Sequence, residues 1–396
     1  MLFVSLVFGQ LMRRLHQPAV LGELIGGILL GPTVLGFLAP HIFFALFPEN
    51  AAITHAREGV IQIGMLFFLF VAGLEINLSH LRQNKWSILC TSLFGFIFPF
   101  GIGFGSILIA PDIWRQPHNP NILFALFIGI ALSISALPVI ARILMELRLL
   151  HRRMGIIVMT AASINDIIGW SFFAVLLSRL NADVHERSIW KTVILIAVFS
   201  VSILGFGRWK GKPFFKWVRH SFIWPNGFIC VIAVFILITA AIAEALNIHA
   251  IFGAFLVGVA LYHVFVQKEE YRAREIIYQF AMSLFAPLYF VSIGLKVNFI
   301  SHFDIQLVLL VILLGSIGTV GGATLGALIS KVSWRESLAI GFGMNARGAM
   351  EIILASTALE YGLINQEMFV ALVIMALVTS MLSGPLLQWI LKVPRS

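Results

Sequence analysis

The sequence predicts an all-α polytopic membrane protein with about thirteen transmembrane helices. Composition is the first reason, because 60% of the 396 residues are hydrophobic and only 11% are charged, whereas soluble domains carry about 25% charged residues. The second reason is that long apolar runs follow one another along the whole chain, and the third is that charge alternates between their connections.

The apolar runs are separated by short polar connections, as expected for helices that cross a bilayer repeatedly. About 20 apolar residues span the hydrocarbon core when they are helical. The predicted helices lie at approximately 1–15, 18–46, 59–78, 86–110, 121–145, 154–178, 189–207, 222–244, 247–266, 276–297, 305–330, 336–359 and 367–391.

Lys and Arg concentrate on one side of the membrane. Nineteen of the 27 basic residues fall in every second connection, whereas six fall in the others. By the positive-inside rule, we expect the N-terminus outside and the C-terminus in the cytoplasm, in a bacterial inner (plasma) membrane. These loops explain the net charge of +9, so we expect no nucleic-acid partner. Cys90 and Cys230 have no metal-site spacing, and no cofactor is expected.

Two motifs recur in the same order. Gly22–Gly31 aligns with His249–Gly258, and Phe70–Asn77 aligns with Val291–Asn298, at offsets of 227 and 221 residues. The predicted helices two to six then correspond to helices nine to thirteen. Because seven helices separate the copies, they have opposite orientations in the membrane. Such inverted five-helix repeats are typical of secondary transporters, whose sites lie at the midplane between the halves.

The predicted helix at 121–145 contains hydroxyls and a proline at mid-membrane depth. Ser133 and Ser135 precede Pro138, which removes one backbone hydrogen bond and crowds the carbonyl one turn earlier. Unwound backbone is tolerated in a membrane only where protein or a water-filled cavity satisfies it. We therefore expect a broken helix here, with an ordinary proline kink as the alternative.

Its counterpart in the second repeat, at 336–359, has glycines that weaken the helix and three polar side chains, Asn345, Arg347 and Glu351. We expect this helix to be broken as well and to cross the first. Crossed half-helices direct partial charges inward, positive at N-termini and negative at C-termini. Arg347 and Glu351, one helical turn apart, would balance these charges. An ordinary internal ion pair is the alternative, and both roles are compatible.

Asp166 is a carboxylate roughly twelve residues from either membrane face, within the apolar helix at 154–178. Burying its charge in hydrocarbon costs several kcal/mol even on the lenient insertion scales. A residue this costly either contacts a buried partner or belongs to an ion or proton path. The other features of the chain favour the second role.

Six motifs spread over nearly the whole chain carry a resemblance to a known family. They are Gly22–Pro32, Ser133–Leu150, Ala161–Asp166, Ile248–Gly258, Tyr289–Asn298 and Asn345–Leu354. With them the chain resembles the monovalent cation:proton antiporters, closest to the branch of the Kef-type potassium systems and the plant cation/proton exchangers. Several motifs in one order make the resemblance specific.

The resemblance implies the sodium/proton antiporter fold and an exchange of sodium or potassium ions for protons, and no enzyme activity. It also implies a homodimer with a scaffold and a mobile core of predicted helices four to six and eleven to thirteen, which moves like an elevator. We expect one exchanger domain over 1–396, with repeat one at about 18–178, repeat two at about 247–391 and no soluble regulatory domain. Between the repeats lie a linker helix and a basic loop at about 189–220, of which Arg208–His220 is expected to lie at the lipid surface.

Two departures from the family pattern bear on stoichiometry. Electrogenic relatives carry two adjacent aspartates where this chain has Asn165 and Asp166, and Thr319 stands where many relatives have a lysine. The first aspartate and the lysine are expected to be lost together, because either charge alone would be buried without a compensating partner. We infer one exchangeable carboxylate and electroneutral one-for-one exchange. Asn165 is expected to stabilise the broken helices by hydrogen bonds rather than to bind the ion.

The expected mechanism is competition at Asp166, which holds either a proton or a transported monovalent cation but not both. The empty charged site is costly to move across the membrane, so only loaded states cross. For Ser163, simple interhelical packing is an equally good explanation. The oxygens expected to complete the shell of the cation are those of Ser133, Ser135, Ser163 and the carbonyl of Ile134.

Two other classes of function make different demands on the sequence. An intramembrane aspartyl protease needs two facing aspartates that share a proton, and Asp166 is the only aspartate at mid-membrane depth. A cation channel, or a membrane sensor that does not transport, is compatible with the same sequence. A channel would carry cation current without opposed proton movement, so ion flux separates these alternatives.

Overall fold

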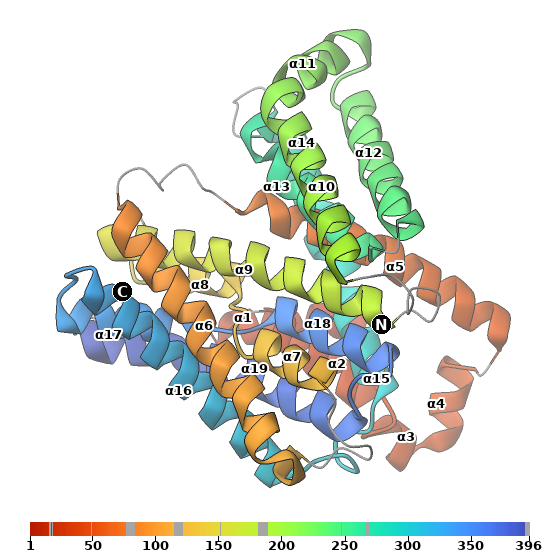
Figure 1. Cartoon of the computed structure of the whole chain (residues 1–396). Coiled ribbons are helices and arrows are strands. Elements are labelled where there is room, and N and C mark those ends of the chain that lie inside the picture. Colours follow the sequence, from red (N-terminus) through yellow and green to blue (C-terminus); the bar gives the residue numbers. More distant parts are fainter. Residues whose placement is uncertain are drawn as a thin grey trace. The chain divides into compact units, whose positions relative to one another are not determined.

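The computed structural model describes residues 1–392 except 16, 18, 49, 77–83, 115–121, 151, 181–188, 247 and 266–269. All regular structure in these ranges is helical (Figure 1). Within them, nine helices are long and apolar enough to cross a bilayer, and ten if one bent pair counts as a span. The all-helical membrane fold is confirmed, whereas the count of thirteen stays a prediction. Among residues named or counted above, Asn77, Arg82, Arg115, Arg187, Lys268 and Arg395 lie outside the described residues.

The chain folds into two compact units, each built from two stretches of sequence. Unit 1 comprises Met1–Ile76 and Leu177–Ser301, and unit 2 comprises Asn77–Leu176 and His302–Ser396. The helices of unit 1 are α1 (Leu2–Arg14), α2 (Ala19–Leu30), α3 (Leu35–Leu38), α4 (Pro40–Leu46), α5 (Ala51–Leu74), α10 (Ile189–Phe206), η4 (Gly207–Gly211), α11 (Lys212–Ser221), α12 (Asn226–Ala245), α13 (Ala250–Phe265), α14 (Tyr271–Phe280), η5 (Ala281–Phe285) and α15 (Ala286–Lys296).

Unit 2 contains the helices that the family resemblance assigns to the core. They are α6 (Lys85–Ile109), η2 (Pro111–Trp114), α7 (Ile122–Ala131), α8 (Leu137–Glu146), most of α9 (Arg153–Leu180), α16 (Ile305–Ile329), α17 (Trp334–Met344), α18 (Ala349–Glu360) and α19 (Gln366–Leu391). Every candidate site residue singled out from the sequence lies in this unit.

Two helix boundaries differ from those expected. The run at 18–46 is not one helix, because α2 ends at Leu30 and α3 and α4 follow Gly31 and Pro32. Proline has no amide hydrogen and restricts the preceding residue, so it favours this break. The helix expected at 59–78 begins earlier, at Ala51, where the side chain of Asn50 accepts a hydrogen bond from the Ala52 amide. Arg57 therefore lies inside α5 and not in a connection.

In unit 1, two of the close backbone contacts that glycines allow are related by the internal repeat. A Cβ on Gly31, directly after α2, would collide with the carbonyl oxygen of Gly294 in α15, and a Cβ on Gly258 of α13 would collide with the backbone of α5 beside Gly73. The sequence alignment pairs Gly31 with Gly258, and Gly73 with Gly294. Each contact is thus the counterpart of the other, which is the pattern that an internal repeat produces. Small residues at such crossings are typical of membrane helices.

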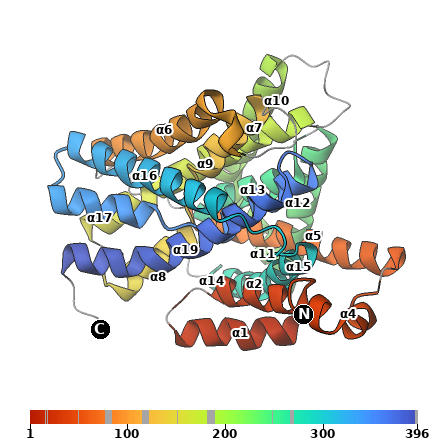
Figure 2. The ribbon, with the colours of Figure 1, turned by 90° about the horizontal axis from the view of Figure 1, so that it is seen from below.

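In unit 2, α6 and α16 pack closely along their length (Figures 1 and 2). Gly322 and Gly326 of α16 face backbone carbonyls of α6, and Gly318 faces Pro99. A larger side chain at any of these glycines would push the two helices apart. The interrupted helices pack beside this pair, α7 against α6 and α17 against α16.

Both helices expected to be broken are interrupted in the structure. α7 ends at Ala131 and α8 begins at Leu137, while α17 and α18 are bent by 43° at the break after Met344. Pro138 is in the first turn of α8, where its missing amide hydrogen costs no helical hydrogen bond. It therefore begins a second helix, and the alternative of an ordinary kink in one continuous helix is wrong.

Candidate functional site

Asp166 lies in the middle of α9, a helix of 28 residues that is roughly 42 Å long. Its side chain is fully buried, with 0% of its surface exposed. The carboxylate therefore faces protein and not lipid, as a functional or paired acid at this depth must. Among the described residues, no group of three or more His, Cys, Asp and Glu side chains gathers into a metal site.

The helix that carries Asp166 packs against both breaks. Gly169 lies three residues after Asp166, on the same face of α9. A Cβ on Gly169 would meet a side-chain carbon of Ile134, in the first break, at 2.5 Å. Directly before the second break, at the last-but-one residue of α17, Gly343 faces Val158 of α9. The middle of α9 is thereby placed beside the point where the backbone is unwound.

Asn165 is held by α6. Its side-chain amide lies 2.7 Å from the hydroxyl oxygen of Ser92. With the amide nitrogen on that side, Asn165 donates to the backbone carbonyls of Ser92 at 3.0 Å and Ala161 at 3.3 Å. The contacts with Ser92 join α9 to α6, and the bond to Ala161 stays within α9. Stabilisation of the broken helices by Asn165 stays a prediction. Ser92 was missed from the sequence, because a single serine in an apolar span carries no motif.

The two breaks are joined by hydrogen bonds between their extended backbones. The amide of Ala136 donates to the carbonyl of Ala346 at 2.9 Å, and the hydroxyl of Ser135 donates to the carbonyl of Met344 at 2.7 Å. Ser133 donates to the carbonyl of Gly129 at 2.7 Å, with the carbonyl of Phe96 at 3.1 Å. The freed backbone groups are thus satisfied by protein, as an unwound segment in a membrane requires.

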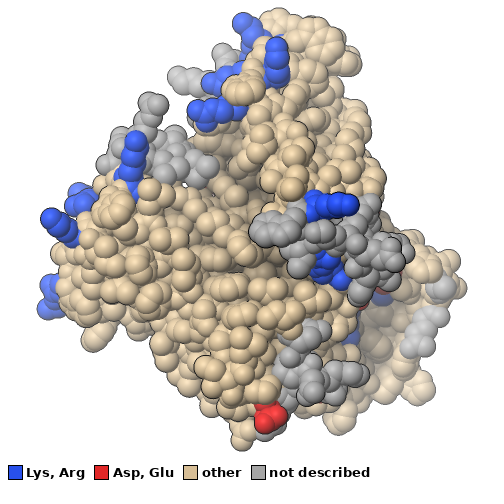
Figure 3. Space-filling model, viewed as in Figure 1, with Lys and Arg blue, Asp and Glu red and all other residues tan. Residues whose placement is uncertain are grey.

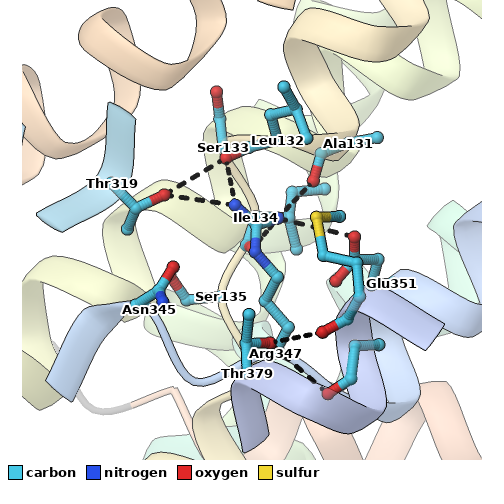
Figure 4. A network of polar contacts seen from close by, with 12 residues as sticks. Ala131, Leu132, Ser133, Ile134, Ser135, Thr319, Asn345, Arg347, Glu351 and Thr379 are labelled. Atoms are coloured by element: carbon cyan, nitrogen blue, oxygen red, sulfur yellow. Dashed lines mark hydrogen bonds and ion pairs between the residues drawn. The ribbon is translucent and has the colours of Figure 1, made fainter. Parts of the chain in front are cut away.

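Arg347 has a 1% exposed side chain and supplies donors to the C-terminal end of α7 (Figure 4). Its guanidinium donates to the carbonyls of Ala131 at 2.7 Å and Leu132 at 2.5 Å, and more weakly to that of Ile134 at 3.4 Å. The last carbonyls of a helix have no intrahelical partners and carry partial negative charge. The guanidinium therefore satisfies and neutralises the end of this half-helix.

Glu351 lies in the first turn of α18, where a negative charge is favoured by the helix dipole. Its Oε1 atom is 3.5 Å from a guanidinium nitrogen of Arg347, and the side chain is as buried as that of Arg347. Its Oε2 atom has no hydrogen bond with a described residue. The pair thus links the C-terminal end of α7 to the N-terminal end of α18, two helix ends of opposite polarity. An isolated internal ion pair would not make this connection.

Thr319 and Asn345 complete the surroundings of the crossing. The hydroxyl of Thr319 donates to the carbonyl of Leu132 at 3.3 Å and accepts from the Arg347 guanidinium at 3.2 Å. Asn345 follows the last residue of α17, and its amide nitrogen donates to the hydroxyl of Ser316 at 3.2 Å. Ser380 of α19 donates to the Arg347 carbonyl. Ser316 and Ser380 could not be found from the sequence, because their partners are distant in the chain.

The oxygens expected to bind a cation are all engaged in hydrogen bonds. Ser163 donates to the carbonyl of Met159, one turn earlier in α9, at 2.8 Å. The Ile134 carbonyl accepts from Arg347, and Ser133 and Ser135 donate to backbone carbonyls. A hydroxyl oxygen that donates its hydrogen keeps lone pairs for a cation. Cation binding by these residues therefore stays a prediction.

Comparison with known proteins gives a match along the whole chain. A family model described as sodium/hydrogen exchanger, transmembrane, matches residues 2–393. Cation/H(+) antiporter 18 of Arabidopsis thaliana is 33% identical over 401 residues, which cover 98% of this chain and 48% of that protein. The Na(+)/H(+) antiporter NhaS4 of Synechocystis is 30% identical over 400 residues, which cover 98% of this chain and 94% of that protein. The chain thus spans about half the length of its plant relatives.

Solved structures share the fold. The sodium proton antiporter MjNhaP1 of Methanocaldococcus jannaschii aligns with a TM-score of 0.67, covering 99% of this chain and 96% of that one. The sequence identity is 16%, so this likeness concerns the fold alone.

Removing Arg347 should destabilise the crossing more than removing both members of the buried pair. In Arg347→Gln the α7 carbonyls lose their donors and Glu351 is left buried without its cation. Breaking a buried pair typically costs about 3–5 kcal/mol. Thermal unfolding of the purified protein in detergent should show a large loss of stability, and Arg347→Gln/Glu351→Gln should recover part of it.

Arg152→Gln is the matched control, because Arg152 is exposed in the same unit. It should unfold like the unchanged protein. If the double variant were as unstable as the sum of the two single variants, Arg347 and Glu351 would not be coupled and the role assigned to the pair would be wrong.

Proposed function

The chain belongs to the sodium/hydrogen exchanger family, and from this premise we propose that it is a secondary active transporter that exchanges a monovalent cation for protons. Sodium and potassium are the proposed cations. Two relatives support this by their names: the Na(+)/H(+)-K(+) antiporter GerN of Bacillus cereus, 30% identical over 384 residues, is named for both ions, and the yeast K(+)/H(+) antiporter 1, 29% identical over 394 residues, is named for potassium.

The observation that carries the proposal is a fully buried carboxylate, Asp166, in the middle of a membrane-spanning helix that packs against two interrupted helices. A carboxylate in a low-dielectric interior is stable only when it is neutralised. A bound proton and a bound cation both neutralise it, and one excludes the other. Competition of this kind couples the two ions without any further catalytic group.

The charges at the crossing support Asp166 as the exchangeable group. Arg347 and Glu351 are bound to each other and to the half-helix ends. Such a pair contributes to the framework, because loss of either charge would leave the other uncompensated. The proton exchange is accordingly assigned to Asp166 alone, with Asn165 held by Ser92.

The proposed movement is elevator-like alternating access by unit 2, with unit 1 as the scaffold of a homodimer. Support comes from the composition of unit 2, which holds both interrupted helices and α9 in one compact body. Such a body can move with its site intact, as in transporters built from inverted repeats. The paired glycine contacts of unit 1 are what such a repeat would produce.

The chain is an integral membrane protein, and the charge distribution supports a cytoplasmic C-terminus. We place it in a bacterial inner membrane. The near-complete coverage of the bacterial relatives NhaS4 and GerN, at 94% and 92% of their lengths, supports this, although relatives also occur in a plant and a yeast.

The decisive variant is Asp166→Asn, which removes the ionisable group and keeps the shape of the side chain. In proteoliposomes that hold an acidic interior and a pH-sensitive dye, sodium or potassium should dequench the dye with the unchanged protein. The variant should lose this response because it can neither release a proton nor hold the cation.

Asp112→Asn is the same substitution at an exposed position of unit 2 and should transport normally. Gel filtration of both variants checks that they fold. A full dye response from a well-folded Asp166→Asn protein would exclude Asp166 as the exchange site.

Electroneutral exchange is the proposed stoichiometry, since one carboxylate alternates between one proton and one cation. In proteoliposomes with a voltage-sensitive dye and no other permeant ion, transport by the unchanged protein should build no potential. Asn165→Asp/Thr319→Lys restores the charge pair of electrogenic relatives beside Asp166, so this variant should generate a potential if it folds. A potential built by the unchanged protein would contradict electroneutrality.

A cation channel or a non-transporting sensor is the second candidate on this fold. The dye experiment separates them, because a channel would carry cations without moving protons in the opposite direction and a sensor would carry neither. The buried Asp166 favours the exchanger, because a carboxylate at mid-membrane is costly unless a proton or a cation neutralises it.

A further inference from the structure

A basic helical segment projects from a membrane-spanning helix of unit 1. α10 continues without a break through the π-helical turn η4 into α11, which ends at Ser221. The 18 residues of α10 extend about 27 Å, close to the hydrocarbon thickness of about 30 Å. The next span, α12, begins at Asn226. η4 and α11 therefore lie where the chain leaves the hydrocarbon and returns to it, at the level of the lipid headgroups.

One face of this segment is fixed to unit 1 by apolar packing. Phe215 and Val218 of α11 are fully buried, in one cluster with Phe228 of α12 and Leu261 of α13. Among these residues Phe215 and Phe228 have ring centroids 5.4 Å apart. Because this inner face is buried, the orientation of α11 about its own axis is set, and its opposite face must point away from the protein.

Two further contacts hold the ends of the segment. At Gly207, where η4 begins, a Cβ would collide with the carbonyl of Ala260 in α13, so the backbones touch. Near the end of α11, the Arg219 guanidinium lies 3.3 Å from Glu270 Oε1. Arg219 thus belongs to the packing of unit 1, and the segment is a rigid part of that unit.

The outward face is strongly basic. From Gly207 to Ser221 the chain has five Lys and Arg and no Asp or Glu. Four of these cations, Arg208, Lys210, Lys212 and Lys216, are exposed, and none forms an ion pair with a described residue. In the space-filling view, Lys and Arg side chains gather over the part of unit 1 that contains α11 (Figure 3).

Two tryptophans lie exposed among these cations. Trp209 is 79% exposed and Trp217 is 58% exposed. Cytoplasmic cations alone would follow from the positive-inside rule. Large exposed indole rings are not explained by that rule, and they are costly in water. Tryptophan is enriched at the membrane–water interface, where its ring enters the apolar boundary and its N–H remains hydrated.

We propose that this outward face, formed by Arg208, Trp209, Lys210, Lys212, Lys216 and Trp217, binds the headgroups of anionic phospholipids and anchors unit 1 to a negatively charged leaflet. The cations attract phosphate and other anionic groups of the headgroups, and the indoles enter the layer beneath. A lipid surface is the occupant that fits, because a free phosphate ion would leave both tryptophans exposed to water. This proposal requires only that the chain spans a membrane. It is therefore independent of which ion the protein exchanges.

Quenching by brominated lipids tests this directly in the full-length protein. Nanodiscs contain phosphatidylglycerol and phosphatidylcholine in equal amounts, with bromine on the acyl chains of one lipid at a time. The fluorescence of Trp209 and Trp217 is obtained as the difference in tryptophan fluorescence between the unchanged protein and Trp209→Phe/Trp217→Phe. This fluorescence should be quenched about twofold or more strongly by brominated phosphatidylglycerol than by brominated phosphatidylcholine, because cations near the surface enrich anionic lipid.

The charge variant Lys210→Gln/Lys212→Gln/Lys216→Gln should quench equally with both lipids. Its matched control is Arg152→Gln/Arg153→Gln/Arg335→Gln, which removes the same charge from exposed positions of unit 2. The control should keep the preference for phosphatidylglycerol, and high salt should abolish it. Equal quenching by both lipids in the unchanged protein, or a preference that survives in the charge variant, would overturn the proposal.

Discussion

The hydrogen bonds from Arg347 to the end of α7 are the interaction on which the rest of the core depends. Breaking a helix in a membrane leaves carbonyls with neither an amide partner nor water, at a cost of several kcal/mol for each such group. A single guanidinium from the second broken helix satisfies carbonyls of the first, and Glu351 neutralises the guanidinium. Hydrogen bonds to a charged group contribute about 1.5–3 kcal/mol each, about twice as much as bonds between neutral groups.

In the proposed mechanism, these two charges hold the half-helix ends and ion exchange is assigned to another group. The contacts of the described residues support this division. The pair of Arg347 and Glu351 is bound to the helix ends, and Asn165 is bound to Ser92 of α6. Asp166 follows Asn165 on α9 and lies one turn before Gly169, whose backbone contacts Ile134. A carboxylate whose neighbours are held by other contacts can exchange a proton for a cation without disturbing the fold.

Much of this arrangement was predictable from the sequence, because charge and proline are costly in an apolar helix and therefore stand out. Asp166, Pro138 and the Arg347–Glu351 pair were identified in this way. Ser92 and Ser380 were not, since a serine is cheap in a membrane helix and its partner is set by tertiary packing. The break after Leu30 was not predicted, because apolar residues continue on both sides of Gly31 and Pro32 and conceal the turn that these two residues favour.

Proton release on cation binding tests most directly whether Asp166 holds one ion or the other. Sodium or potassium is added to the purified protein in weakly buffered detergent solution, and the protons released are compared with the cations bound. Competition predicts roughly one proton per cation for the unchanged protein, and neither binding nor release for Asp166→Asn. Cation binding without proton release, or release that persists in Asp166→Asn, would contradict exchange at this carboxylate.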